Sequence, residues 1–217
     1  MKINTIHFDS NESMTDLCAL GIKYPTDKSP FAPAYNGSGH RHPYTPIYNF
    51  LFSAHRYAPI KLAEIGILNN MSMKCWREFF TNAKLFGFEY NLNLLENAKS
   101  HKLENTSYHF MDVTKEESIE EGLSLYGPYD IVIDDSTHTF GDQIRIILSA
   151  YKHIKPGGIL IIEDIFLDYD EDAYSIEIEQ VKQYFSSITF VTGLHKNKYS
   201  GDWNNDKMLV LHRNEKI

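Results

Sequence analysis

The chain has 217 residues, of which 42% are hydrophobic and 23% charged, enough apolar material for one sizeable core. Its formal net charge of -8, with Lys and Arg scattered, argues against a nucleic-acid-binding protein, which normally carries a clustered basic face. No stretch approaches transmembrane length, and the N-terminus lacks the apolar core of a signal peptide. Cys18 and Cys75 lie far apart and form no ligand-like pair, which is typical of a protein in the reducing cytoplasm. We therefore expect a cytoplasmic protein, and because no membrane span is predicted we expect no membrane partner.

The first quarter of the chain differs from the rest. The segment from Gly21 to Phe50 is rich in Pro, Gly, Tyr and His, which predicts a long loop. A long, aromatic-rich loop is more typical of a lid or a substrate wall than of a linker. Apolar residues then recur at helical spacing from Tyr44 to Arg56. We therefore expect an N-terminal extension, residues 1–57, that ends in a helix.

From residue 58 onward, predicted strands and helices alternate. Two final strands follow with no helix between them, so they should pair antiparallel. The pattern predicts one compact α/β domain, residues 58–217, with a Rossmann-like, mostly parallel seven-stranded sheet, an antiparallel last strand and helices on both faces. A helix is expected over residues 176–185, and the strands over residues 60–67, 84–90, 107–113, 129–135, 157–164, 188–194 and 207–213.

Each of the first five predicted strands ends in polar residues. Ligands of open α/β sheets bind beyond the carboxyl ends of the strands. A single acid at such an end is most simply a surface residue, but polar groups at five ends out of five favour a binding site. The residues at these ends and in the turns that follow them are Glu64, Gly66, Asn69, Asn70, Ser72, Glu89, Asp112, Asp134, Asp135, His138, Glu163 and Asp164.

Glu89 ends the second strand, about twenty residues beyond the tight turn after the first. A carboxylate there is placed to accept both hydroxyls of a ribose, which predicts an adenosine ligand. A dinucleotide fold would carry several glycines in the first turn, to rest a pyrophosphate on the next helix. Here the turn is "EIGILNNMS", with one glycine, so an NAD-dependent oxidoreductase is disfavoured.

Several motifs together resemble a known family. They are "LAEIG", "FGFE", "YGPYDIVIDDSTH" and "KPGGILIIED", with an upstream Thr26-Asp27-Lys28 and a segment from His42 to Tyr48. The chain resembles a class I S-adenosylmethionine-dependent methyltransferase, and within that class the metal-dependent mycinamicin-type macrolide and sugar O-methyltransferases. The resemblance covers about residues 23–213.

The resemblance implies a set of site residues. Asp135, Glu163 and Asp164 would bind Mg²⁺ or Mn²⁺, and His138 would be the catalytic base. Neighbouring strand ends should bring these acids together, and clustered carboxylates repel one another unless a cation or protons offset them. The residues expected to bind S-adenosylmethionine are Glu64, Gly66, Asn70, Ser72, Glu89, Asp112 and Asp134. Those expected to contact the substrate are Lys28, His42 and Tyr44, whereas Tyr48 fits a core position equally well.

The implied function is metal-assisted O-methylation of a saccharide hydroxyl, on a sugar nucleotide, a glycoside or a surface polysaccharide. A catechol-like acceptor is an alternative, since it also presents two oxygens to a metal. A non-catalytic scaffold is another, favoured only by Asn69-Asn70, where family members usually keep glycine. Asn adopts left-handed backbone more readily than most residues, so the turn can survive. The sequence leaves a homo-oligomer open.

Overall fold

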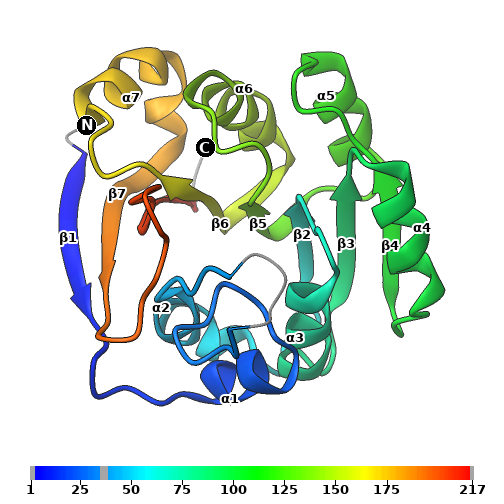
Figure 1. The fold of residues 1–217 in the computed structure, drawn as a ribbon. Helices are drawn as coiled ribbons and strands as arrows, with labels where there is room; N and C mark the ends of the chain where they lie inside the picture. Colours follow the sequence, from blue (N-terminus) through cyan, green and yellow to red (C-terminus); the bar gives the residue numbers. More distant parts are fainter. Residues whose placement is uncertain (1–2, 35–38, 216–217) are drawn as a thin grey trace.

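Eight strands form one sheet in the order β1-β7-β8-β6-β5-β2-β3-β4 (Figure 1). The computed structural model describes residues 3–34 and 39–215. The strands are β1 (Asn4–Asp9), β2 (Lys61–Ile65), β3 (Lys84–Glu89), β4 (Thr106–Phe110), β5 (Tyr129–Asp134), β6 (Ile154–Ile165), β7 (Phe185–Leu194) and β8 (Lys207–Arg213).

All neighbouring strands run parallel except β8, which lies antiparallel between β6 and β7. This confirms the predicted Rossmann-like sheet with antiparallel pairing at its C-terminal end. The central strands are apolar on both faces, and Ile131, Val132 and Ile133 of β5 are fully buried. Such strands require helices on both sides of the sheet.

Strand β1 is an eighth strand that the sequence analysis did not predict. It pairs in parallel with β7, from Asn4 opposite Thr189 to Asp9 opposite Leu194. Five of its six side chains are exposed, so it carries no apolar run that would mark it as a strand. The first residues of the expected N-terminal extension therefore belong to the sheet, and the lid interpretation applies only to the later residues of that extension.

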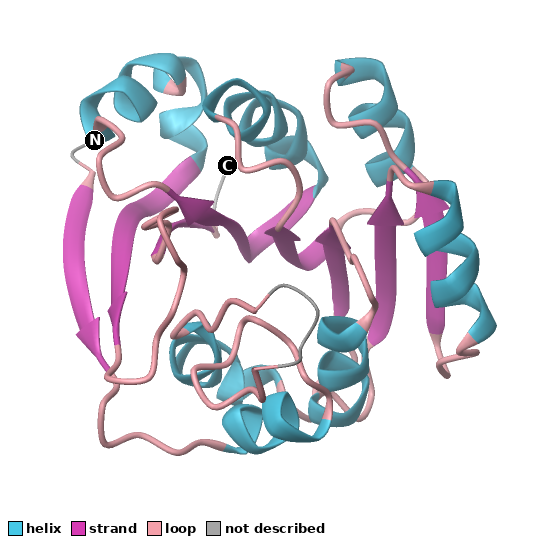
Figure 2. Cartoon of the chain, viewed as in Figure 1, coloured by secondary structure: helices cyan, strands magenta, loops and turns pink. Residues whose placement is uncertain are grey.

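Helices cover both faces of the sheet (Figure 2), and each face has its own hydrophobic cluster. In Figure 1, α5, α6 and α7 lie above the sheet, and α1, α2 and α3 below it. The helix expected over residues 176–185 begins earlier, because the Asp170 side chain caps α7, and a 3₁₀ helix continues it to Tyr184. The helices are α1 (Asp16–Lys23), α2 (Tyr44–Phe52), α3 (Met71–Phe79), α4 (Leu92–Ser100), α5 (Glu116–Ser124), α6 (Phe140–Ala150) and α7 (Glu171–Glu177).

Aromatic packing fixes α2 beneath the strand ends. The Tyr48 ring stacks on Phe52 at 5.1 Å and meets Trp76 of α3 edge-on at 5.3 Å. All three side chains are buried, and such aromatic pairs add about 0.5–1.5 kcal/mol each beyond their buried area. This packing holds the hydroxyls of Tyr44 and Tyr48 against the ends of β6. Among the helices described, none has the length and apolar character needed to cross a bilayer.

Candidate active site

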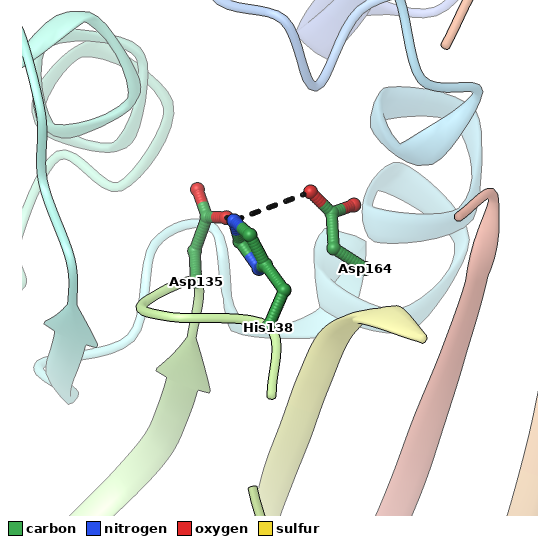
Figure 3. Close-up of side chains that lie close together, drawn as sticks. All are labelled: Asp135, His138 and Asp164. Carbon is green, nitrogen blue, oxygen red and sulfur yellow. Dashed lines mark ion pairs between the residues drawn. The ribbon is translucent and has the colours of Figure 1, made fainter. Parts of the chain in front are cut away.

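Three side chains converge where β5 and β6 end (Figure 3). Asp135 and His138 follow β5, and Asp164 lies near the end of β6. One ligand atom of each lies within 4.8 Å of the others. His138 Nε2 is 3.7 Å from Asp164 Oδ2 and 3.9 Å from Asp135 Oδ1. The two strands are parallel neighbours, so their carboxyl ends meet at one edge, as predicted.

The backbone at two of these residues is left-handed. The φ angle is 59° at His138 and 56° at Asp164. For residues other than glycine, this conformation costs on the order of 1–3 kcal/mol, and it concentrates at functional sites. The fold maintains it here at the two residues that face each other across the cluster.

Lys28 joins the acids from the N-terminal segment. Its ammonium donates to the carboxylates of Asp135 and Glu163, the latter at 2.5 Å. Glu64 Oε1 lies 3.4 Å away, and the Lys28 side chain is only 2% exposed. Burial alone would lower the Lys28 pKa, but these carboxylates raise it well above its ordinary value. Lys28 is thus an internal counter-ion of the acids, and the predicted contact with substrate remains a prediction.

Glu163, an expected metal ligand, is held differently from Asp135 and Asp164. Its carboxylate accepts hydrogen bonds from Lys28 and from the Tyr48 hydroxyl. Burial raises the pKa of Glu163 well above its ordinary value and that of Asp135 to about 7, although Lys28 opposes both shifts. The structure therefore groups Asp135 and Asp164 with His138, and places Glu163 with Lys28. A metal-ligating role for Glu163 remains a prediction.

His42 and Tyr44 lie behind Asp164. The Tyr44 hydroxyl is 2.7 Å from Asp164 Oδ1 and 2.8 Å from the Asn205 carbonyl oxygen. His42 Nδ1 is 3.0 Å from Asp206 Oδ1, and its ring stacks on Tyr44. Burial would lower the His42 pKa, but Asp164 and Asp206 raise it to about 9. Both rings are at most 2% exposed, so their expected contact with an acceptor stays a prediction.

A cavity of about 210 Å³ opens beside the acids, at the ends of β2 and β3. A mostly apolar lining with a few polar groups suits an adenosine. Gly66, Glu89 and Asp135 are among the predicted site residues that line it. The other lining residues are Ile65, Leu68, Phe88, Tyr90, Leu94, Met111, Val113, Ser136 and Thr137.

Glu89 closes the turn that borders this cavity. Its Oε2 accepts the backbone N–H groups of Ile67 at 3.3 Å and Leu68 at 3.2 Å. Its Oε1 accepts the N–H of Asn91 at 2.8 Å. The carboxylate that we expect to bind ribose hydroxyls therefore also fixes the backbone on two sides of the cavity.

Gly66 allows two strand ends to approach closely. Its φ is 83°, in the region that favours glycine, and an added Cβ would lie 2.1 Å from the carbonyl oxygen of Asp135. The single glycine of the first turn therefore determines the shape of the cavity wall.

The Asn69-Asn70 turn keeps the expected geometry. Asn70 precedes α3 with a left-handed φ of 68°, as predicted for a residue that replaces glycine. It is fully buried, and its Nδ2 lies 3.0 Å from His101 Nδ1 on the side of α4. Asn70 is thus directed toward α4, and its expected contact with the cofactor stays a prediction.

The remaining expected cofactor residues support the cavity from behind. Glu64 is fully buried and accepts the indole N–H of Trp76 at 2.8 Å. Asp112 accepts from Thr114 and Lys115. Asp134 accepts the Ser136 hydroxyl at 2.6 Å, and burial raises its pKa to about 6. Ser72 is 6% exposed. These four lie outside the lining of the cavity of about 210 Å³, and their contact with the cofactor stays a prediction.

Residues 66–210, more than half of the chain, match the methyltransferase domain family. The chain belongs to this family. The match begins at Gly66, directly after β2, and ends in β8, so it includes the ends of β3, β4, β5 and β6.

Curated relatives of this methyltransferase domain are named as O-methyltransferases. Mycinamicin VI 2''-O-methyltransferase of Micromonospora griseorubida is 27% identical over 161 residues, covering 71% of this chain and 37% of the relative. Demethylmacrocin O-methyltransferase of Streptomyces fradiae is 31% identical over 119 residues, covering 51% and 28%. The chain spans less than half the length of these curated relatives.

The fold agrees with these relatives. The MycE methyltransferase of the mycinamycin pathway, solved with Mg, SAH and mycinamycin VI, superposes with a TM-score of 0.67 at 20% identity. The superposition covers 92% of this chain and 55% of MycE. The resemblance to S-adenosylmethionine-dependent methyltransferases, and within them to the mycinamicin type, is confirmed.

Proposed function

We propose that this domain transfers the methyl group of S-adenosylmethionine to a sugar hydroxyl, with a divalent cation held at the ends of β5 and β6. The observation that carries the proposal is the convergence of Asp135, His138 and Asp164 beside the cavity of about 210 Å³. Support for a sugar acceptor comes from the names of the relatives, which methylate sugars on macrolides or tetracenomycins.

The donor set fits Mg²⁺ or Mn²⁺. Asp135, which is half-buried, and Asp164, which is buried, both offer carboxylate oxygens, the ligands that hard cations prefer. Asp135 meets Lys28 through Oδ2 and faces His138 through Oδ1, so one of its oxygens can bind a cation while the other keeps its ion pair. A bound divalent cation supplies Lewis acidity, which lowers the pKa of an acceptor hydroxyl.

The chain's own residues divide the remaining work. The cavity and Glu89 hold the adenosine, and Gly66 lets the cofactor approach the end of β5. His138 Nε2, which lies 3.9 Å from Asp135 Oδ1 and 3.7 Å from Asp164 Oδ2, takes the hydroxyl proton as general base. Holding donor and acceptor in line provides most of the rate enhancement.

Transfer of a labelled methyl group tests the proposal. The assay combines the protein with labelled S-adenosylmethionine, Mg²⁺ and a panel of methyl glycosides, including methyl α-L-rhamnopyranoside. We expect labelled glycoside with Mg²⁺ and at least a hundredfold less with a chelator. Micromolar binding of S-adenosylhomocysteine in calorimetry is the control that the protein is folded and binds the cofactor. Protein that passes this control and methylates catechols but no glycoside would contradict the sugar assignment.

A further inference from the structure

The acceptor needs a surface that His42 and Tyr44 do not offer. The polar atoms of both side chains already meet Asp206, Asp164 and the carbonyl oxygen of Asn205. A sugar that reaches Asp164 must therefore rest on side chains further out.

A chain of aromatic rings lies just outside this buried pair. We name Phe140, Tyr169, Phe166, Trp203 and His40 the aromatic rim. Successive ring centroids are 6.4, 5.0, 6.1 and 5.7 Å apart in that order. Trp203 is 50% exposed and lies nearly parallel to Phe166, with 18° between the ring planes. The rim thus presents a large, partly exposed apolar face.

The rim is continuous with the proposed catalytic residues. Phe140 comes two residues after His138, and Phe166 two residues after Asp164. At the other end, the His40 ring is 5.6 Å from His42, whose Nε2 is 3.8 Å from Asp164 Oδ1. The β7–β8 loop that carries Trp203 is tied to β6 by a 2.8 Å backbone hydrogen bond from Leu167 to Asn204.

Asn205 provides a second, independent observation. Its side chain is 1% exposed, and neither Oδ1 nor Nδ2 has a hydrogen-bond partner among the residues that the structure describes. A buried amide without partners costs about 1–3 kcal/mol, so such a group is expected to meet a ligand. Its backbone oxygen lies 2.8 Å from the hydroxyl of Tyr44, which also contacts Asp164.

We propose that the aromatic rim and Asn205 form the acceptor subsite, and that it binds a pyranose ring. The C–H face of a pyranose packs against the electron-rich face of Trp203, and its hydroxyls match the donor and acceptor of an amide. The identity of this ligand rests on the proposed function, whereas the position of the subsite rests on the contacts above.

Tryptophan fluorescence tests the subsite without requiring turnover. The chain has two tryptophans, and Trp76 is 1% exposed whereas Trp203 is 50% exposed. Methyl α-L-rhamnopyranoside, added to protein saturated with S-adenosylhomocysteine and Mg²⁺, should change the emission saturably. The Trp203→Phe variant should lose this change. Trp203→Ala should raise the KM for the glycoside about tenfold with little change in kcat. Tyr57→Ala, at a more exposed aromatic outside the rim, should change neither the emission response nor the KM.

The outcomes separate the two proposals. Saturable, Trp203-dependent binding without methyl transfer would support the subsite and contradict the proposed function. Methylation of glycosides with the same KM in Trp203→Ala and Tyr57→Ala would overturn the subsite alone. Fluorescence that responds equally in Trp203→Phe would also overturn it.

Discussion

The carboxyl ends of the parallel strands form one edge of the sheet, and the two halves of this edge are built differently. At the ends of β2 and β3, a cavity of about 210 Å³ opens over a mostly apolar lining, and backbone geometry at Gly66 sets its shape. At the ends of β5 and β6, Asp135, Glu163 and Asp164 pack with Lys28 and two tyrosine hydroxyls. The first half thus contains the cavity, and the second contains the cluster of carboxylates with its lysine.

This contrast predicts which perturbation should affect which property. A change in the first half alters the room for the cofactor and should act on cofactor affinity. A change in the second half leaves a buried charge without its counter-charge, or removes the base that takes the acceptor proton. It should therefore change the turnover rate, the dependence on Mg²⁺ and the stability of the fold. Among the described residues, only Asp135 both lines the cavity of about 210 Å³ and belongs to the group of acids at the ends of β5 and β6. Variants of other residues can therefore separate the halves.

His138→Ala should have the largest effect. Loss of a general base lowers kcat by about 10²- to 10⁴-fold. Affinity for S-adenosylhomocysteine should stay the same, because His138 lies outside the cavity lining. Initial rates and calorimetry measure the two quantities. His138→Asn is the control for the backbone, since Asn tolerates the left-handed φ. An active Asn variant would mean that activity depends on the backbone conformation at this position and not on the imidazole. A fully active Ala variant would exclude His138 as the general base.

Lys28→Met should destabilise the fold. It leaves Asp135, Glu163 and Glu64 without their buried counter-ion, which costs about 3–5 kcal/mol of unfolding free energy. Urea unfolding in a chelator measures the loss, and Mg²⁺ should restore more stability to the variant than it adds to the wild type. Lys196→Met is the control, because its pair with Glu12 is exposed on both sides and should contribute about 1 kcal/mol or less. Equal losses in both variants would contradict the counter-ion role.

The same division explains what the sequence could predict. Asp135, His138 and Asp164 were predicted together because parallel neighbouring strands end at one edge, which follows from alternation of strands and helices. Glu89 was predicted from its spacing beyond the first turn, and the left-handed Asn70 from local turn chemistry. These inferences needed only the order of elements along the chain and the residue type at each position.

Features that depend on long-range docking were not predicted. Lys28 reaches Glu163 across 135 positions in the sequence, and nothing in its neighbourhood marks it as buried. The exposed, polar strand β1 pairs with β7, more than 180 residues away, and carries no apolar alternation to reveal it. Asp206, the partner of His42, immediately precedes β8 and resembles an ordinary loop acid in the sequence.

Gly66→Ala tests the cavity half. The variant places a Cβ 2.1 Å from the Asp135 carbonyl at a left-handed φ, which should cost on the order of 1–3 kcal/mol and lower affinity for S-adenosylhomocysteine at least tenfold. Calorimetry and urea unfolding measure both effects. Gly141→Ala, in α6, is the control, because its Cβ would meet nothing within 4 Å among the described residues. Unchanged affinity in Gly66→Ala would show that the cavity wall adapts.

Glu89→Gln should have the smallest effect and the most specific one. The amide keeps an oxygen for some of the backbone N–H groups of Ile67, Leu68 and Asn91, but it loses the charge that strengthens these bonds and the expected ribose contact. Affinity for S-adenosylhomocysteine should fall about tenfold, the range of one charged hydrogen bond. The concentration of Mg²⁺ that gives half-maximal activity should not move, because Glu89 lies in the half without the acid cluster. A shift in this Mg²⁺ dependence as large as the loss of affinity would mean that the two halves respond as one unit.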